Sequence, residues 1–148
     1  MPIRDVRRSE FRHFIDIVTR WWDNDVYGHV NNVAYYSFFD TAVNRFLIDN
    51  GALDIRSDLV IGYVAETGCA YFRPVSFPDA LQVGLRVTRL GTSSVRYEVA
   101  LFRAGEDAAA AAGHFVHVYV DRRTGRSAPI PELARRLLST IAVPSSLE

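Results

Sequence analysis

Alternating apolar and polar residues predict four β-strands in the second half of the chain. The clearest alternation covers residues 81–88 and 95–102, on either side of a Leu-Gly-Thr-Ser turn. A third run extends over residues 114–121, and residues 59–73 form a long apolar stretch in which two glycines favour a bent strand. A period of two with one apolar face is typical of successive antiparallel strands that cover a core.

The first half predicts one more strand and a long helix. Residues 11–20 alternate in the manner of a strand with one wetter face, and the Asp-, Asn- and Gly-rich segment that follows is typical of a turn. Residues 33–47 contain no Gly or Pro, and Asn50-Gly51 gives a helix stop signal. Apolar residues surround most of this helix, so we expect it to be buried on most sides: Tyr35, Phe38, Phe39, Ala42, Val43, Phe46 and Leu47.

This order of elements predicts an α+β fold, in which a five-stranded antiparallel sheet curls around one long central helix. A short amphipathic helix is expected over residues 129–140. No repeat or linker interrupts the chain, so we expect a single domain over residues 1–148. Residues 1–8 and 142–148 are expected to be loose tails.

Composition narrows the possible functions. The 148 residues are 49% hydrophobic and carry 17 basic and 17 acidic side chains, which gives no electrostatic case for a nucleic-acid partner. Every basic residue is Arg, so lysine Schiff-base chemistry is excluded, and the single cysteine, Cys69, excludes an internal disulfide or a multi-thiolate metal site. With no secretory leader and no apolar run of about 18 residues, we expect a cytoplasmic protein without membrane partners.

Residues 20–32 are the segment most suggestive of chemistry. Asp23 and Asp25 precede Gly28 and the start of the predicted helix. An EF-hand calcium loop is disfavoured because its twelfth position would be Ala34. The two remaining interpretations are a structural turn that caps the helix, and a catalytic carboxylate beside free helix N–H groups that hold an oxyanion. The second would suit hydrolysis of a thioester.

The pattern Asp-x-Asp-x-x-Gly-His-Val-Asn-Asn-x-x-Tyr, which leads into an aromatic-rich helix, resembles the signature of hot-dog-fold acyl-CoA thioesterases of the 4-hydroxybenzoyl-CoA thioesterase-like family. The later stretch from residue 70 to 101 is similar to the family's aromatic–Arg–Pro strand and hairpin. The resemblance covers residues 11–138.

The resemblance implies a hot-dog fold and a homodimer, often paired into a homotetramer, with active sites between subunits. It assigns the catalytic aspartate to Asp25 and the oxyanion-holding N–H to Asn32. His29 is expected to orient Asp25 or line the pocket, with a turn role as the alternative, and Tyr35 is expected to shape the acyl end. The motif differs from that of the aromatic-substrate enzymes, which favours aliphatic acyl chains.

Coenzyme A carries three phosphate groups, so cations are expected at the mouth of the site. The candidates are Arg73, Arg89 and Arg123, with Arg122 and Arg126 in the same turn as Arg123. We expect no metal and no cofactor, because CoA is part of the substrate. Other hypotheses are an acyl-carrier-protein thioesterase, a non-catalytic acyl-CoA-binding module and a scaffold protein.

Overall fold

A computed structural model describes residues 5–143, and the parts of both predicted tails at 1–4 and 144–148 lie outside the described residues. Within the described part, two helices and five strands are joined by loops and by two short 3-10 turns. In chain order the elements are η1 (Arg8–Glu10), β1 (His13–Val18), η2 (Trp21–Asp23), α1 (Asn32–Asp49), β2 (Val60–Tyr71), β3 (Ala80–Leu90), β4 (Ser94–Arg103), β5 (Ala111–Asp121) and α2 (Glu132–Ser139).

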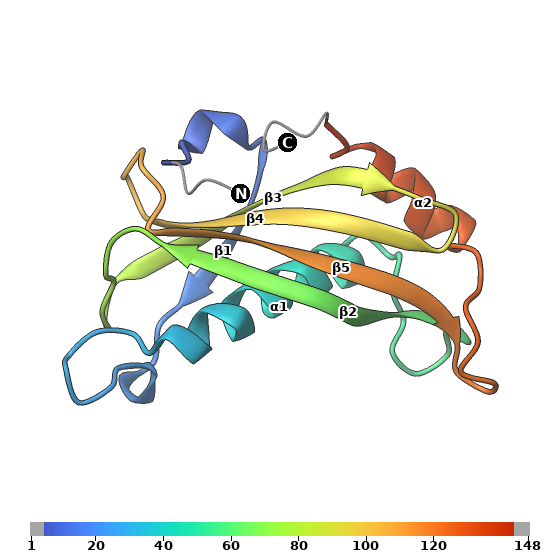
Figure 1. The fold of residues 1–148 in the computed structure, drawn as a ribbon, viewed down its shortest axis with the longest axis horizontal. Helices are drawn as coiled ribbons and strands as arrows, with labels where there is room; N and C mark the ends of the chain where they lie inside the picture. Colours follow the sequence, from blue (N-terminus) through green and yellow to red (C-terminus); the bar gives the residue numbers. More distant parts are fainter. Residues whose placement is uncertain (1–4, 144–148) are drawn as a thin grey trace.

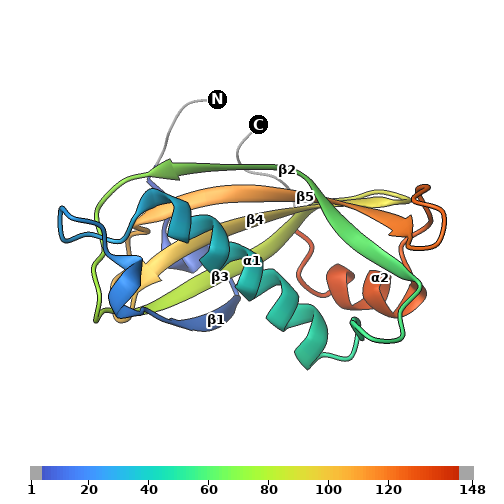
Figure 2. The ribbon, with the colours of Figure 1, turned by 90° about the horizontal axis from the view of Figure 1, so that it is seen from below.

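The five strands form one antiparallel sheet in the order β1-β3-β4-β5-β2. Helix α1 crosses one face of this curved sheet, as Figures 1 and 2 show. The apolar residues that alternate with polar ones in β3 and β4 all lie in the core between the sheet and the helix: Leu81, Val83, Leu85, Val87, Val95, Tyr97, Val99 and Leu101. The predicted α+β hot-dog architecture is therefore confirmed.

Helix α1 begins where Asn31 caps it, since the Asn31 side chain accepts a hydrogen bond of 2.9 Å from the Val33 N–H. It ends before Gly51, which adopts a φ of 75° that favours glycine. All seven apolar positions expected to be buried are buried. The opposite side of α1, including Val33 and Ile48, is exposed in the single chain. The prediction that this helix is buried on most sides was therefore wrong.

The other face of the sheet is partly covered by the N-terminal segment. Val6 and Phe11 are buried there against Ala100 and Phe102, and Arg86 forms a buried ion pair of 2.7 Å with Glu98 nearby. The prediction of loose tails is therefore wrong for residues 5–8. It is also wrong for 142–143, because the Val143 N–H bonds to the Val87 carbonyl at 2.7 Å.

Strand β5 begins at Ala111, three residues before its expected start. Alanine and glycine have low strand propensity, which hides this part of the strand in the sequence. Packing explains why small residues occur here: a Cβ on Gly113 would lie 2.2 Å from the Gly68 carbonyl oxygen of β2. No helix in the described residues is long and apolar enough to cross a membrane.

Candidate active site

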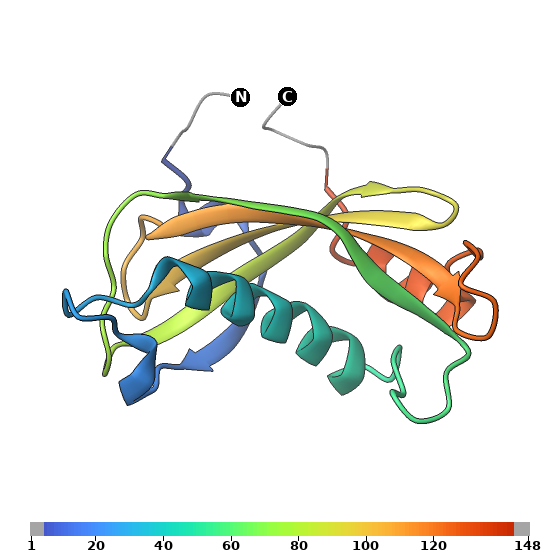
Figure 3. The same ribbon diagram turned by 60° about the horizontal axis from the view of Figure 1, so that its bottom comes forward.

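The loop between β1 and α1 extends beyond one end of the sheet (Figure 3) and is held in shape by Asp23. The Asp23 side chain is buried and accepts hydrogen bonds from the Arg20 N–H at 2.7 Å and the Arg20 guanidinium at 3.0 Å. Its backbone carbonyl accepts a bond of 2.8 Å from the Asn31 N–H. Asp23 is therefore a structural residue that fixes both ends of the loop.

Asp25 lies two residues further on and is only half-buried. Its Oδ1 accepts a hydrogen bond of 2.9 Å from the Tyr27 N–H, and its backbone N–H bonds to the His29 carbonyl at 2.9 Å. The turn therefore fixes the backbone of Asp25 and one of its carboxylate oxygens, while the residue as a whole stays partly exposed.

The turn after β2 is hydrogen-bonded to the same loop. The Val30 N–H donates to the Val75 carbonyl at 2.8 Å, the Ser76 hydroxyl donates to the Gly28 carbonyl at 2.8 Å, and the Phe77 N–H donates to the Asn24 Oδ1 at 2.9 Å. A segment more than 40 residues away along the chain thus sets the position of the Asp25 turn.

Asn32 is the first residue of α1, and its backbone N–H finds no hydrogen-bond acceptor among the described residues. The neighbouring Val33 N–H is already used by the Asn31 cap. The Asn32 carbonyl accepts a bond of 3.0 Å from the Tyr71 hydroxyl at the end of β2. A free N–H at a helix N-terminus favours negative charge, so it can hold an oxyanion.

Two further predicted site residues, His29 and Tyr35, lie on either side of Asn32 in the chain. The exposed His29 side chain makes no hydrogen bond to Asp25 in the described structure, and the two residues are joined only through the backbone. Tyr35 is 4% exposed and packs edge-on against Tyr71, with ring centroids 5.0 Å apart. Burial raises the pKa of Tyr35, and the backbone of Val75 opposes part of that shift.

Sequence reasoning missed Tyr71 as a site residue. Its only signal was the aromatic–Arg–Pro stretch that begins there, and the contact with Asn32 depends on the tertiary fold. The thiol of the neighbouring Cys69 is half-buried, and burial raises its pKa to about 11. That thiol is protonated at neutral pH and is a poor nucleophile.

The arginines expected at the mouth of the site do not gather in one chain. Arg73 follows β2 at the Asp25 end, where it pairs with Asp5 at 3.4 Å and donates to the Ala109 carbonyl. Arg89 lies near the end of β3, and Arg123 lies in the turn after β5, paired with Asp121 at 2.9 Å. Both lie at the opposite end of the sheet from Asp25, because β3 and β5 start near Asp25 and run away from it.

Two cavities lie near the elements described above. One of about 460 Å³ lies beside the end of β1, the start of β3 and the Phe77-Pro78 turn, and one of about 250 Å³ lies at the C-terminal end of α1. Asp25 lines neither of them. No three His, Cys, Asp or Glu side chains converge as a metal site in the described part of the chain.

A curled five-stranded antiparallel sheet around one long helix defines the hot-dog fold. The chain belongs to the thioesterase-like superfamily, whose family model matches residues 19–138.

Among solved structures, the chain is similar to the PA5185 protein of Pseudomonas aeruginosa strain PAO1, with 53% identity and a TM-score of 0.93 over 98% of this chain and 100% of the other. It is also similar to a thioesterase of Thermus thermophilus complexed with coenzyme A and Zn. That match has 31% identity and a TM-score of 0.72 over 86% of this chain and 92% of the other. The YsmA protein of Bacillus subtilis (strain 168) is 26% identical over 64% of this chain, and the match spans only 63% of the length of YsmA.

Proposed function

We propose that the protein is an acyl-CoA thioesterase that hydrolyses an aliphatic acyl-CoA to the free acid and CoA. One observation carries the proposal: the half-buried Asp25 lies in a fixed turn before α1, whose first N–H, on Asn32, has no acceptor in the described structure. An acid and an oxyanion donor on adjacent parts of one loop are what acyl transfer to water requires.

In the proposed reaction the thioester oxygen binds at the Asn32 N–H, where the helix dipole favours the developing negative charge. Asp25 either removes a proton from the attacking water, or attacks the carbonyl carbon itself to form a mixed anhydride, which water hydrolyses once CoA has left, so that the carboxylate is restored. The CoA thiolate then leaves, and because a thiolate is a good leaving group, no strong acid is needed beside it. The reaction needs no metal or redox cofactor.

The choice of CoA is supported by the similar Thermus thermophilus thioesterase, which was crystallised with coenzyme A. Arg73 is the expected phosphate-binding arginine that lies at the Asp25 end of the sheet. Arg89 and Arg123 serve the same site only if a second chain brings them there. The proposed preference for aliphatic chains rests on the His29-Val30-Asn31-Asn32 form of the motif, which differs from that of the aromatic-substrate enzymes.

A homodimer is proposed because the single chain leaves the site open. Strand β2 is a sheet edge, and its residues 63–67 are exposed, with Tyr63 and Val64 52% and 48% exposed. Around Asp25, the side chains of Trp22, Val26 and Tyr27 are at least 76% exposed. A long apolar edge strand is a template for pairing, so a second copy of the chain is its expected partner.

Sedimentation velocity tests this assembly. Val64→Lys is expected to give monomers and to lower the rate of thioester hydrolysis, whereas Leu133→Lys on the exposed face of α2 should leave the dimer intact. A wild-type monomer that is fully active would contradict the proposed shared site.

A cytoplasmic location of the protein is also part of the proposed function.

The activity itself is tested with a panel of straight-chain acyl-CoA thioesters and a thiol-trapping reagent, alongside matched acyl-carrier-protein thioesters. We expect faster thiol release from acyl-CoA. Faster release from the carrier protein would favour the acyl-carrier-protein alternative. Thermal stabilisation by acyl-CoA without any thiol release would identify a binding module and overturn the proposal.

A further inference from the structure

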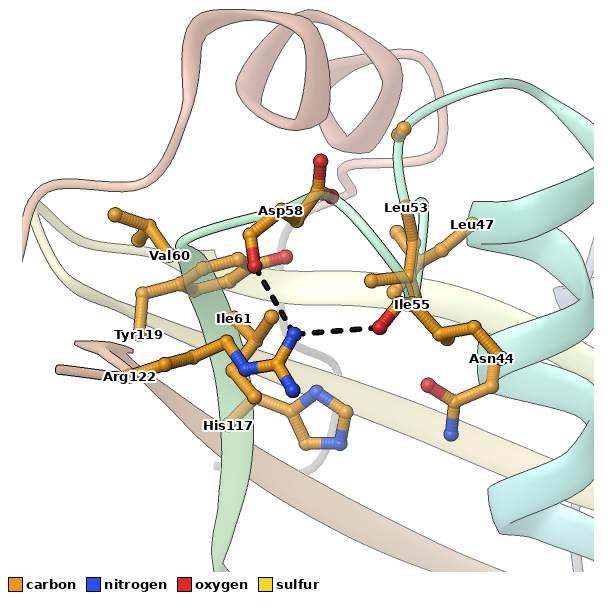
Figure 4. Close-up of a pocket in the computed structure, with 12 residues that line it drawn as sticks. Asn44, Leu47, Leu53, Ile55, Asp58, Val60, Ile61, His117, Tyr119 and Arg122 are labelled. Carbon is orange, nitrogen blue, oxygen red and sulfur yellow. Dashed lines mark hydrogen bonds between the residues drawn. The ribbon is translucent and has the colours of Figure 1, made fainter. Parts of the chain in front are cut away.

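The cavity at the C-terminal end of α1 has the features of a second ligand site. Its walls come from α1, the segment 52–58, the start of β2 and the end of β5 (Figure 4). Asn44, which lines it, lies 12 residues after Asn32 in the same helix, or about 18 Å along the helix axis. Within one chain the cavity is therefore separate from the proposed thioesterase site.

His117 is the most unusual residue in this cavity. Its side chain is 2% exposed, yet neither ring nitrogen has a hydrogen-bond partner in the described structure. Buried polar groups in native proteins are nearly always paired. His117 lines the cavity, but both ring nitrogens have less than 1 Å² of accessible surface, so a molecule in the cavity pairs with one of them only after a small rotation of the ring or its neighbours.

A cation lies beside this ring. Arg122 donates from its Nη1 to the carbonyls of Ile55 and Asp58, at 3.2 and 3.1 Å, which holds the guanidinium at the cavity wall. Figure 4 shows the Arg122 guanidinium and the Asn44 amide on either side of the His117 ring. The remaining side-chain N–H groups of Arg122 have no acceptor among the described residues.

Two carboxylates also act on the cavity wall, Asp40 on His117 and Asp58 on Tyr119. The Asp58 carboxylate accepts a bond of 3.0 Å from the Asp54 N–H, and in Figure 4 it points away from Arg122. The Asp40 carboxylate accepts a bond of 3.2 Å from the Asn44 amide. Burial lowers the pKa of His117, so its ring is neutral near pH 7 and offers one N–H donor. The polar wall thus offers fixed donors and one positive charge to a guest.

The rest of the wall is apolar and sets the size of the guest. Leu47, Ala52, Leu53, Val60 and Ile61 line it. The volume of about 250 Å³ exceeds the roughly 150 Å³ of an apolar cavity that admits benzene, so a chain of about six carbons fits.

We propose that this cavity binds a small carboxylate with a short unbranched apolar chain. The carboxylate lies between Arg122 and His117, and the chain packs against Leu47, Leu53 and Val60. Arg–carboxylate pairing with a neutral imidazole N–H as a second donor suits one oxyanion group. Binding at this site does not depend on the activity proposed for Asp25.

Hexanoate is the probe, and hexanol is the matched compound without a carboxylate. Calorimetry on the full-length protein should show saturable binding of one hexanoate per chain, with hexanol at least about tenfold weaker. Titration followed by ¹⁵N NMR of the histidine side chains should shift the ring nitrogens of His117 and leave those of His114 and His29 in place. No saturable binding, or shifts only at the other histidines, would overturn the proposal.

Variants separate this site from the thioesterase site. His117→Phe keeps an aromatic ring in the cavity wall but removes both nitrogens, and should lose at least about tenfold in hexanoate affinity. His114→Phe, on the opposite face of the same strand, should bind hexanoate normally. Asp25→Asn should also bind hexanoate normally, so a failed thioesterase assay and a failed binding site are distinguishable. Equal binding by His117→Phe and wild type would contradict the assignment, and the NMR titration of the wild type stands even if that variant does not fold.

Discussion

The hydroxyl of Tyr71 donates a hydrogen bond of 3.0 Å to the backbone carbonyl of Asn32. This bond joins the end of β2 to the first turn of α1, which carries the proposed oxyanion donor. Because β2 is also the proposed dimer edge, the bond couples the assembly surface to the position of the helix N-terminus.

Tyr71→Phe tests that coupling. The variant keeps the ring that packs against Tyr35 but removes the hydroxyl, at an expected cost of about 0.5–1.5 kcal/mol for one hydrogen bond. We expect kcat for acyl-CoA hydrolysis to fall by up to about tenfold, with little change in KM, because the lost bond positions the oxyanion donor. Steady-state kinetics over a range of acyl-CoA concentrations measures both constants. A change in KM alone would assign Tyr71 to substrate binding instead.

Asn32→Pro removes the proposed oxyanion donor itself. Proline is tolerated at the first position of a helix, and Asn31 already has the extended backbone, with φ −61° and ψ 140°, that a residue before proline prefers. The helix should therefore form, while kcat should fall by about 10²–10³, as when an oxyanion-hole donor is lost.

Asn32→Ala is the matched control, because it removes the exposed side chain and keeps the backbone N–H. It should retain most of the wild-type rate. Circular dichroism of both variants checks that α1 is intact. An active Asn32→Pro variant would show that the oxyanion is held elsewhere.

The stability of the fold should depend on pH through two histidines, the buried His117 and the half-buried His13. Burial lowers the pKa of His117 and of His13 below the ordinary value of 6.5, although the Asp40 carboxylate opposes the shift at His117. Below pH 6.5 the unfolded chain therefore binds more protons than the folded one, so the free energy of unfolding falls as the pH drops through this region. It stops falling once the pH is below the folded-state pKa values.

Each histidine can contribute at most about 1.4 kcal/mol per pH unit to this slope. Chemical unfolding between about pH 5.5 and 7.5 measures it. His117→Phe should flatten the pH dependence, whatever its effect on absolute stability. An unchanged slope would mean that His117 does not stay neutral in the folded protein.

Much of the fold could be predicted from the sequence because its cause is local. The alternation in residues 81–88 and 95–102 identifies the buried faces of β3 and β4, and the seven apolar positions of α1 all reach the core. The first three residues of β5 could not be recognised, since alanine and glycine have low strand propensity and Gly113 is required by the nearby carbonyl of Gly68 on the neighbouring strand.

The candidate site was predictable only in part, for the same physical reason. Asp25 and Asn32 belong to one motif, and the structure places them on one loop and helix start. Tyr71 enters through a contact 39 residues apart in sequence, and the positions of Arg89 and Arg123 depend on strand direction in the finished sheet. The cavity at His117 likewise needs four separate segments to come together.

The central claim is that the Asp25 carboxylate performs the hydrolysis, and the rate of thiol release by Asp25→Asn tests it most directly. The variant is nearly isosteric, so the turn and the oligomer should persist. Asp49→Asn, the same change at the other end of α1, is the matched control and should keep the wild-type rate. With a straight-chain acyl-CoA as substrate, we expect Asp25→Asn to be slower by at least about 10². A rate equal to that of the wild type would contradict the account.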